Sequence, residues 1–366
     1  MTRPLRSFLI PLAAFALGGA LEGCGQSTPA VGQAQAAQPV LRRGQALQPP
    51  DALQRRITEL GRGFDGRVGI AVRDVQSGWT AAYNGKDVLP QQSVAKLWVA
   101  IAVMDAIDHG QLNLSDPVLV RREDLSVFHQ PIRAKVGDAG YQATIRELLE
   151  LALTESDNAA NEVLSNKVGG PAGIEAMLRR KRLKGIAFGP GEKTLQTRIA
   201  GLTWRPEFSF GMAFWDAREA LPPTVRRTAM DAYLAQPPDG ATPEAIVDAL
   251  ARLKRGELLS PDTTQWLLTT MSMTKTGPKR LRGGLGPGWT LSHKTGTGQV
   301  LGAQATGFND VGVMTAPDGR AYAVAVMIGS TKRPIPARME FMSAVSRAVV
   351  DQHEGRDPSA TAAVAP

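Results

Sequence analysis

The chain has few of the residues on which metal enzymes and disulfide-stabilised proteins depend. Its 366 residues include one cysteine and four histidines. A single cysteine forms no disulfide within the chain. The histidines have no spacing typical of metal ligands; they are His109, His129, His293 and His353. We therefore expect no metal and no other cofactor.

The sequence also lacks internal repeats, a nucleotide-binding loop and any arginine-rich run interleaved with aromatic residues. Its net charge of +8 would suit a nucleic-acid partner, but no binding-fold pattern accompanies that charge. We expect no nucleic-acid partner, because a positive net charge is also typical of a basic envelope protein. With 43% hydrophobic residues, the chain can bury a core as one large or two ordinary domains.

The N-terminus is typical of an exported protein. Arg3 and Arg6 precede an apolar stretch over residues 8–21, which is short for a membrane span and suits a secretory signal peptide. Cys24 follows Leu-Glu-Gly, a sequence similar to a bacterial lipobox. We predict a signal peptide over residues 1–24. The protein is either tethered to the membrane through a lipidated Cys24 or cut at alanine-rich sites downstream and released into the periplasm.

The segments on either side of the expected folded region lack the regular spacing of apolar residues that indicates helices or strands. Residues 25–50, rich in Gln, Ala and Pro, predict a flexible linker. Residues 353–366 predict a disordered tail. The folded part of the chain is therefore expected between them, over residues 51–352.

Three short motifs occur in one order along that part: Ser93-Val-Ala-Lys96, Ser156-Asp-Asn158 and Lys294-Thr-Gly296. Each alone is ordinary, but their ordered co-occurrence is not expected by chance. A serine hydroxyl is a weak nucleophile and needs a base to take its proton. Lys96 lies three residues after Ser93, which places both side chains on one face of a helix.

The segments around the motifs have clear secondary-structure patterns. Residues 96–108 contain no Gly or Pro and are mostly apolar, which predicts a buried helix with Ser93 at its N-terminus. Residues 144–154 have helical spacing, and Ser156-Asp-Asn158 follows in a turn. Residues 289–298 predict an edge strand, along which an extended substrate can bind.

The three motifs are those of class A β-lactamases and penicillin-binding proteins, and the chain resembles a class A β-lactamase from about residue 52 to about residue 350. The resemblance implies that Ser93 forms an acyl-enzyme with Lys96 beside it, and that Ser156 passes a proton to the leaving nitrogen. It implies an oxyanion hole formed by the backbone N–H groups of Ser93 and Thr297. The implied substrate-binding residues are Asn158, Lys294, Thr295, Gly296 and Thr297.

The expected fold is α/β and β-lactamase/transpeptidase-like. Hairpin patterns at residues 66–83 and 306–328 and a helical pattern at residues 336–350 place sheet pieces near both ends of the chain. We predict an antiparallel sheet built from both termini and flanked by helices, plus an all-helical subdomain over about residues 93–254.

Deacylation needs one more group. Glu192-Lys-Thr-Leu-Gln196, downstream of a Gly-Gly-Pro helix start at residues 169–171, is similar to the family's Glu-x-x-Leu-Asn loop. The resemblance implies that Glu192 activates the deacylating water. Gln196 replaces the usual asparagine and Lys193 the usual proline, which puts the geometry of the loop in question. Glu207 is the alternative base.

An insertion of about residues 197–241 follows this loop, before the next predicted helix at residues 242–254. It carries a concentration of aromatic residues in a chain with only 5% of them: Trp204, Phe208, Phe210, Phe214 and Trp215. We favour a hydrophobic cluster that holds the loop down over a lid on the substrate.

Two further positions are candidates for substrate contact. Arg280 lies nine residues before Trp289, where some class A enzymes place an arginine that helps to bind the substrate carboxylate. A solvated basic turn is the alternative. His129 falls near the family's aromatic gatekeeper, and Phe128 suits that position equally well.

We predict a serine β-lactamase that confers β-lactam resistance and acts as a monomer. Two alternatives stay open: a D-Ala-D-Ala peptidase with the same serine machinery, and a weakly catalytic sensor of β-lactams or cell-wall fragments. Slow or absent turnover with retained binding would select the sensor.

Overall fold

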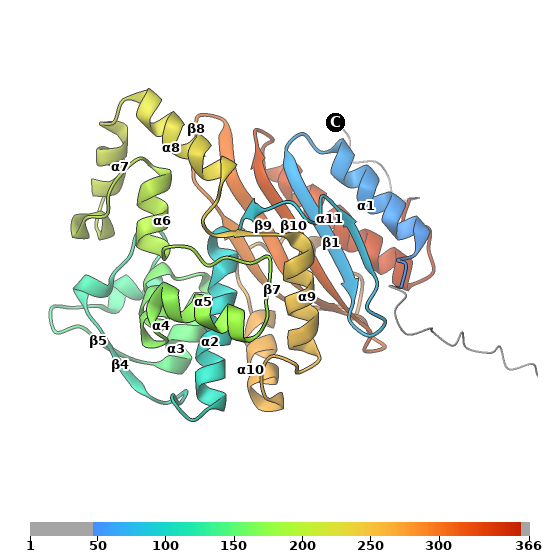
Figure 1. Cartoon of the computed structure of the whole chain (residues 1–366), viewed down its shortest axis with the longest axis horizontal. Helices are drawn as coiled ribbons and strands as arrows, with labels where there is room; N and C mark the ends of the chain where they lie inside the picture. The colour runs from blue at the N-terminus through green and yellow to red at the C-terminus, as the bar shows by residue number, and fades with distance from the viewer. Residues whose placement is uncertain (1–46, 360–366) are drawn as a thin grey trace, which may run out of the picture. The chain divides into compact units, whose positions relative to one another are not determined.

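The computed structural model describes residues 47–359 (Figure 1). The predicted signal peptide, Cys24 and most of the predicted linker lie outside the described residues, as do residues 360–366. Within residues 47–359, no helix is long and apolar enough to cross a membrane.

An antiparallel sheet, with strands from both the N-terminal and the C-terminal part of the chain, forms one half of the fold. Its strand order is β2-β1-β10-β9-β7, with the short β8 also paired to β9. The hairpin β1–β2 comes from the N-terminal part of the chain and the other strands from the C-terminal part, as predicted. The strands are β1 (Arg67–Asp74), β2 (Thr80–Tyr83), β7 (Thr290–Thr297), β8 (Val300–Leu301), β9 (Gln304–Thr315) and β10 (Ala321–Thr331).

Alternation of side chains along the strands fixes which helices cover each face. On β10, Val324 and Val326 pack with the helices α1 (Asp51–Gly63) and α11 (Ile335–His353) in one hydrophobic cluster. Ala323 and Ala325 belong to the core on the opposite face, which α9 (Pro243–Lys254) and α10 (Pro261–Ser272) help to form. A one-residue slip would exchange these faces, so the two cores together specify the register.

Helices and short strands between residues 89 and 254 form the other half of the fold. The helix α2 (Lys96–Asp108) is apolar on all sides and is buried from Lys96 to Asp105, because other helices surround it. The remaining elements before the insertion are β3 (Leu89–Pro90), η1 (Gln92–Ala95), β4 (Pro117–Val120), η2 (Arg122–Asp124), η3 (Pro131–Lys135), β5 (Tyr141–Thr144), α3 (Ile145–Glu150), η4 (Leu151–Glu155), α4 (Asn158–Lys167) and α5 (Gly170–Arg180). Two short strand pairs interrupt the predicted all-helical composition: β4 with β5, and β3 with β6 (Gly240–Ala241).

The prediction of a loop at residues 192–196 is wrong, because this segment begins the helix α6 (Glu192–Ile199). Gly191, with a φ of 86°, makes the sharp entry into that helix. No residue of the segment Glu-Lys-Thr-Leu-Gln-Thr-Arg-Ile is a helix breaker.

The prediction that the next helix begins only at residue 242 is also wrong. The insertion contains η5 (Pro206–Ser209), α7 (Ala213–Glu219) and α8 (Pro223–Ala235), followed by β6 (Gly240–Ala241). Figure 1 shows α6, α7 and α8 grouped together near β8. Only Met230 and Tyr233 of α8 are buried, so its sequence carries a weak amphipathic signal.

Candidate active site

Ser93 and Lys96 lie at the N-terminal end of the buried helix. Ser93 is in the 3₁₀ turn η1, which continues directly into α2 at Lys96. The Lys96 Nζ lies 2.8 Å from the Ser93 Oγ, as the i, i+3 spacing predicts. Burial lowers the pKa of Lys96, against the opposing charges of Glu192, Asp157 and Glu162. A buried amine with a lowered pKa is suited to take the proton of a serine hydroxyl.

Ser156 lies in the turn between two helices. The helix α3 passes into the π-helical turn η4, and Ser156 ends it in the left-handed conformation with a φ of 63°. Asp157 then caps α4 through the backbone N–H of Ala160. Because this turn reverses the chain, the Ser156 hydroxyl reaches the two lysines of the other motifs.

Two buried lysines meet at that hydroxyl. The Ser156 Oγ lies 3.3 Å from the Lys96 Nζ and 3.0 Å from the Lys294 Nζ. Lys294 comes from β7, and burial lowers its pKa well below the ordinary value, with Lys96 and Arg280 adding to the effect. The Asn158 Oδ1 accepts a further hydrogen bond from Lys96, and the Asn158 Nδ2 donates to the Val127 carbonyl oxygen at 2.7 Å. The three motifs thus form one hydrogen-bonded unit.

A cavity of about 400 Å³ opens onto this unit. The predicted residues that line it are Ser93, Ser156, Asn158, Glu192, Thr295, Thr297, Arg280, His129 and Phe128. Lys96 and Lys294 are buried and reach its hydroxyls from behind. The strand β7 is an edge strand, as predicted, since it pairs only with β9.

Gly296 allows β7 to approach the nucleophile. A Cβ at this position would lie 2.4 Å from the Gln91 carbonyl oxygen and 3.3 Å from the Val94 backbone nitrogen. Both atoms belong to backbone next to Ser93, so any side chain would push the strand away from the serine.

Arg280 is not part of a solvated basic turn. Its side chain is largely buried, and its guanidinium lies over the Phe308 ring at 3.7 Å from the ring centroid. The Nη2 donates to the Thr297 Oγ1 at 2.7 Å, and the Nη1 donates to the carbonyl oxygens of Gly296 and Asn309. Burial lowers the pKa of Arg280 to about 10. Arg280 therefore adds positive charge to the cavity wall beside Thr297.

Glu192 lines the cavity from the first turn of α6. Its Oε1 accepts a hydrogen bond from the Gln196 Nε2 at 3.0 Å, and the same nitrogen lies 2.9 Å from the Gln92 Oε1. Gln196 thereby joins the residue next to the nucleophile to the predicted base. Glu207 does not line this cavity; it is exposed and pairs with Arg205 at 3.2 Å.

Several residues that support the site lie outside the three motifs and were not predicted from the sequence. Glu162 of α4 accepts a hydrogen bond from the Glu192 backbone N–H at 3.2 Å, and no side chain of α6 itself caps that end. Tyr233 of α8 is buried and contacts Gln92 and Asp239 through its hydroxyl. The contacts of Glu162 with Glu192 and of Tyr233 with Gln92 join residues 30 and 141 positions apart, so local sequence patterns carry no signal for them.

The aromatic insertion forms a hydrophobic cluster, the interpretation that the sequence favoured. Phe208 and Phe214 are buried, with ring centroids 5.7 Å apart. The Phe214 ring also packs at 4.8 Å from that of Phe128, which lines the cavity. The cluster thus fixes α7 against the cavity wall.

Comparison with known proteins identifies the family of this chain. A sequence profile described as the β-lactamase enzyme family matches residues 52–353. The chain belongs to the β-lactamase enzyme family. Among its relatives, the β-lactamase of Streptomyces albus G is 29% identical over 306 residues, which are 82% of this chain and 84% of that protein. The β-lactamase VEB-1 of Pseudomonas aeruginosa is 24% identical over 81% of this chain and 89% of its own length.

Solved structures that are similar to this chain are also β-lactamases. An ancestral class A β-lactamase is 31% identical, with a TM-score of 0.65 over 82% of this chain and 99% of that one. A β-lactamase from Chitinophaga pinensis is 28% identical, with a TM-score of 0.68 over 82% and 99% of the two chains. This β-lactamase is therefore a class A-like serine hydrolase, and the predicted family and fold are confirmed.

The described residues of this β-lactamase contain no group of three or more His, Cys, Asp or Glu side chains placed to hold a metal ion. The polar groups around Ser93 are instead lysine, serine, asparagine and glutamate side chains.

Proposed function

We propose that this β-lactamase hydrolyses the β-lactam amide through an acyl-enzyme on Ser93 and thereby confers β-lactam resistance. The observation that carries the proposal is that Glu192 faces the same cavity as Ser93 and Ser156. A peptidase shares the serine machinery, whereas rapid hydrolysis of the acyl-enzyme needs a base for water.

The residues divide the reaction into two steps. In acylation, the Lys96 amine takes the hydroxyl proton as the Ser93 Oγ attacks the β-lactam carbonyl. Ser156, hydrogen-bonded to both lysines, donates a proton to the leaving ring nitrogen and is reprotonated through Lys96. In deacylation, Glu192 takes a proton from the water that attacks the ester carbonyl. The Ser93 oxygen then leaves and takes this proton from Glu192, which restores the hydroxyl and the carboxylate.

Substrate binding is proposed to use the β7 edge. Lys294, Thr295 and Arg280 supply positive charge and a hydroxyl for the substrate carboxylate, and Gly296 keeps the edge close to Ser93. Asn158 faces the substrate amide, and the backbone N–H groups of Ser93 and Thr297 stabilise the oxyanion. His129 and Phe128 line the same cavity.

Two variants separate the acylating and deacylating groups. We expect Ser93→Ala to abolish covalent labelling by penicillin, whereas Glu192→Gln retains labelling and accumulates the acyl-enzyme in intact mass spectra. The double variant should behave like Ser93→Ala alone, because the residues act in sequence. Equal loss of labelling in both single variants would exclude Glu192 as the deacylating base.

We also propose that the protein is exported to the periplasm and acts there as a monomer. The basic and apolar pattern of the first 24 residues supports export, and the position of Cys24 supports a lipid anchor. Fractionation of cells that express the full chain and its Cys24→Ala variant distinguishes the two forms. A shift from membrane to soluble periplasm indicates a lipoprotein, and an unchanged soluble distribution indicates a cleaved, free protein.

A further inference from the structure

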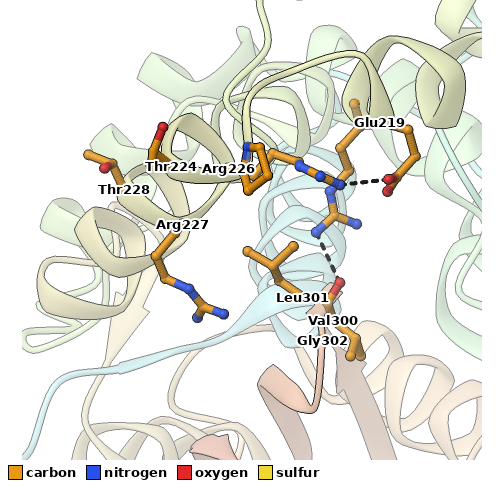
Figure 2. A pocket seen from close by; sticks show the side chains of 10 residues that line it. Glu219, Thr224, Arg226, Arg227, Thr228, Val300, Leu301 and Gly302 are labelled. Carbon is orange, nitrogen blue, oxygen red and sulfur yellow. Dashed lines mark hydrogen bonds and ion pairs between the residues drawn. The ribbon is translucent and has the colours of Figure 1, made fainter.

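A second cavity, of about 720 Å³, lies outside the catalytic one. It is bounded by α7, by the first turns of α8 and by β8, and we call it the arginine pocket after Arg218, Arg226 and Arg227. Figure 2 shows Arg227 extending from α8 towards the segment that carries Leu301, and Arg226 reaching Glu219. The pocket is large enough for a small ligand.

The charges of the arginine pocket are not balanced. Among the described residues that line it, Glu219 alone is acidic, and the Arg226 Nη1 donates to its Oε2 at 2.7 Å. Arg227 has a loose contact of 3.9 Å with Asp231, one turn further along α8. Arg218 forms no ion pair with any residue of the described range, 47–359; its Nη2 donates to the Val300 carbonyl oxygen at 2.9 Å.

Arg218 is the most unusual of the three, because it is only 4% exposed. The Nε atoms of Arg218 and Arg226 are both buried and have no hydrogen-bond partner within residues 47–359. A buried guanidinium without a counter-charge is unfavourable, and each vacant N–H is a donor directed at no protein acceptor. Burial lowers the pKa of Arg218, and the charge of Arg226 adds to the effect while Glu219 opposes it.

The helix α8 strengthens the positive potential of the same pocket. Its first residues, Pro223 and Thr224, line the pocket, and no side chain caps its N-terminus. The dipole of the helix favours an anion at this end, where Pro223 has no N–H and the Val225 and Arg226 N–H groups already donate to the Pro222 carbonyl oxygen. Two independent features, the Arg218 guanidinium without an ion pair among the described residues and the helix end, therefore favour the same sign of ligand charge.

The arginine pocket is linked to the catalytic cavity through residues that lie between them, although no described residue lines both. The strand β7 ends at Thr297 in the catalytic cavity, and β8 begins at Val300 in the arginine pocket. Arg218 lies over the Trp215 ring at 5.6 Å, and that ring stacks at 5.3 Å on Phe128 of the catalytic cavity. A ligand bound to Arg218 is therefore connected to the wall of the catalytic cavity through Trp215 and Phe128.

We propose that the arginine pocket binds a carboxylate or phosphate anion, with Arg218, Arg226 and Arg227 as its ligands. Guanidinium groups bind both anions through paired N–H donors. The anion is either a free one or a second acidic group on the side chain of a β-lactam. Only the latter source rests on the proposed function.

Isothermal titration of the purified exported protein with inorganic phosphate tests the site without any β-lactam. We expect saturable binding that weakens about tenfold or more in Arg226→Gln/Arg227→Gln. The control is Arg198→Gln, which removes an exposed charge from α6 outside the pocket. Thermal melting shows whether each variant is folded. Absence of phosphate binding to the wild type, or equal weakening in the control, overturns the site.

Kinetics then distinguish the two sources of the anion. A cephalosporin with a side-chain carboxylate is compared with its side-chain methyl ester. If the substrate supplies the anion, the double variant raises KM for the acid only and phosphate competes with that substrate. If the anion is free, the ratio of the two KM values is unchanged while phosphate binding is still lost. Failure of all β-lactam hydrolysis would leave the phosphate titration intact, so the two proposals fail separately.

Discussion

Desolvated amines dominate the chemistry at the scale of single residues. The Lys96 and Lys294 side chains are both fully buried, yet each has hydrogen-bond acceptors within 3.3 Å. Burial disfavours the charged form of an amine, and two like charges near one hydroxyl disfavour it further. The site therefore contains an amine with a lowered pKa that is suited to accept the proton of Ser93.

Substitution of Lys96 tests this interpretation. We expect Lys96→Ala to slow acylation about 10²-fold or more, because the serine loses its general base. Lys96→Arg should not restore the rate, since a guanidinium stays protonated and offers no base. The measurement is the rate of adduct formation with penicillin. Recovery of near wild-type acylation in Lys96→Arg would show that only positive charge is needed there.

Glu162 gives the folded protein a pH-dependent stability. Burial and the charge of Glu192 raise the pKa of Glu162 from 4.5 to about 7. The folded state thus retains a proton that the unfolded state releases, so the contribution of this group to stability falls as the pH rises from about 4.5 to about 7.

Glu162→Gln should remove that dependence while it keeps an oxygen for the Glu192 N–H. We expect the variant to melt at a higher temperature than the wild type at pH 8, with the difference vanishing towards pH 4.5. The groups that face Glu162 are Glu192, Lys193 and Lys96. Parallel melting curves over this pH range would show that Glu162 carries no such shift.

The motif residues were predictable from the sequence, and their supports were not. Ser93 and Lys96 lie one helical turn apart, so their contact follows from local geometry. Glu162, Tyr233 and Asp239 act across the tertiary fold. Their positions depend on how α4, α8 and the segment that enters β6 pack together, and local sequence patterns do not predict that packing.

At the scale of elements, the insertion is a structural part of the active site. The Tyr233 hydroxyl of α8 receives a hydrogen bond from Gln92 and donates one to Asp239, while the Gln92 backbone N–H donates to the same carboxylate at 2.7 Å. Gln92 has a φ of 53°, which is unfavourable outside glycine. This buried network holds the strained residue directly before the nucleophile.

Removal of the Tyr233 hydroxyl should loosen that turn. We expect Tyr233→Phe to lower the free energy of unfolding by about 1–3 kcal/mol, because Asp239 and Gln92 lose a buried partner. Acylation should also slow. Urea unfolding and adduct kinetics are the measurements. The control is Tyr83→Phe, whose hydroxyl has no hydrogen-bond partner among the described residues, and an equal loss in the control would contradict the network.

The same scale shows where periodicity succeeds and fails. The hairpins β1–β2 and β9–β10 were predictable because each has two stretches of strand-forming residues joined by a clear turn sequence. The helix α8 was missed because only two of its residues, Met230 and Tyr233, are buried. Its sequence therefore lacks the repeated apolar residues that indicate an amphipathic helix. The helix α6 was missed because the resemblance suggested a loop.

At the scale of the whole molecule, the sheet and the helices share one core. Trp98 of α2, Leu148 of α3 and Leu250 of α9 belong to the same cluster as Val311 and Met327 of the sheet. The nucleophile lies where these two halves meet, because η1 contacts β7 and β9 before α2 enters the helical half. The position of the site is therefore a consequence of the chain path as well as of the three motifs.

The most direct test follows a single reaction of the purified protein with a chromogenic cephalosporin by absorbance and by intact mass at the same time. We predict sustained hydrolysis with no accumulated adduct, because Glu192 faces the same cavity as Ser93. A stoichiometric burst that leaves a stable adduct on the protein would contradict β-lactam hydrolysis and indicate a penicillin-binding peptidase or sensor.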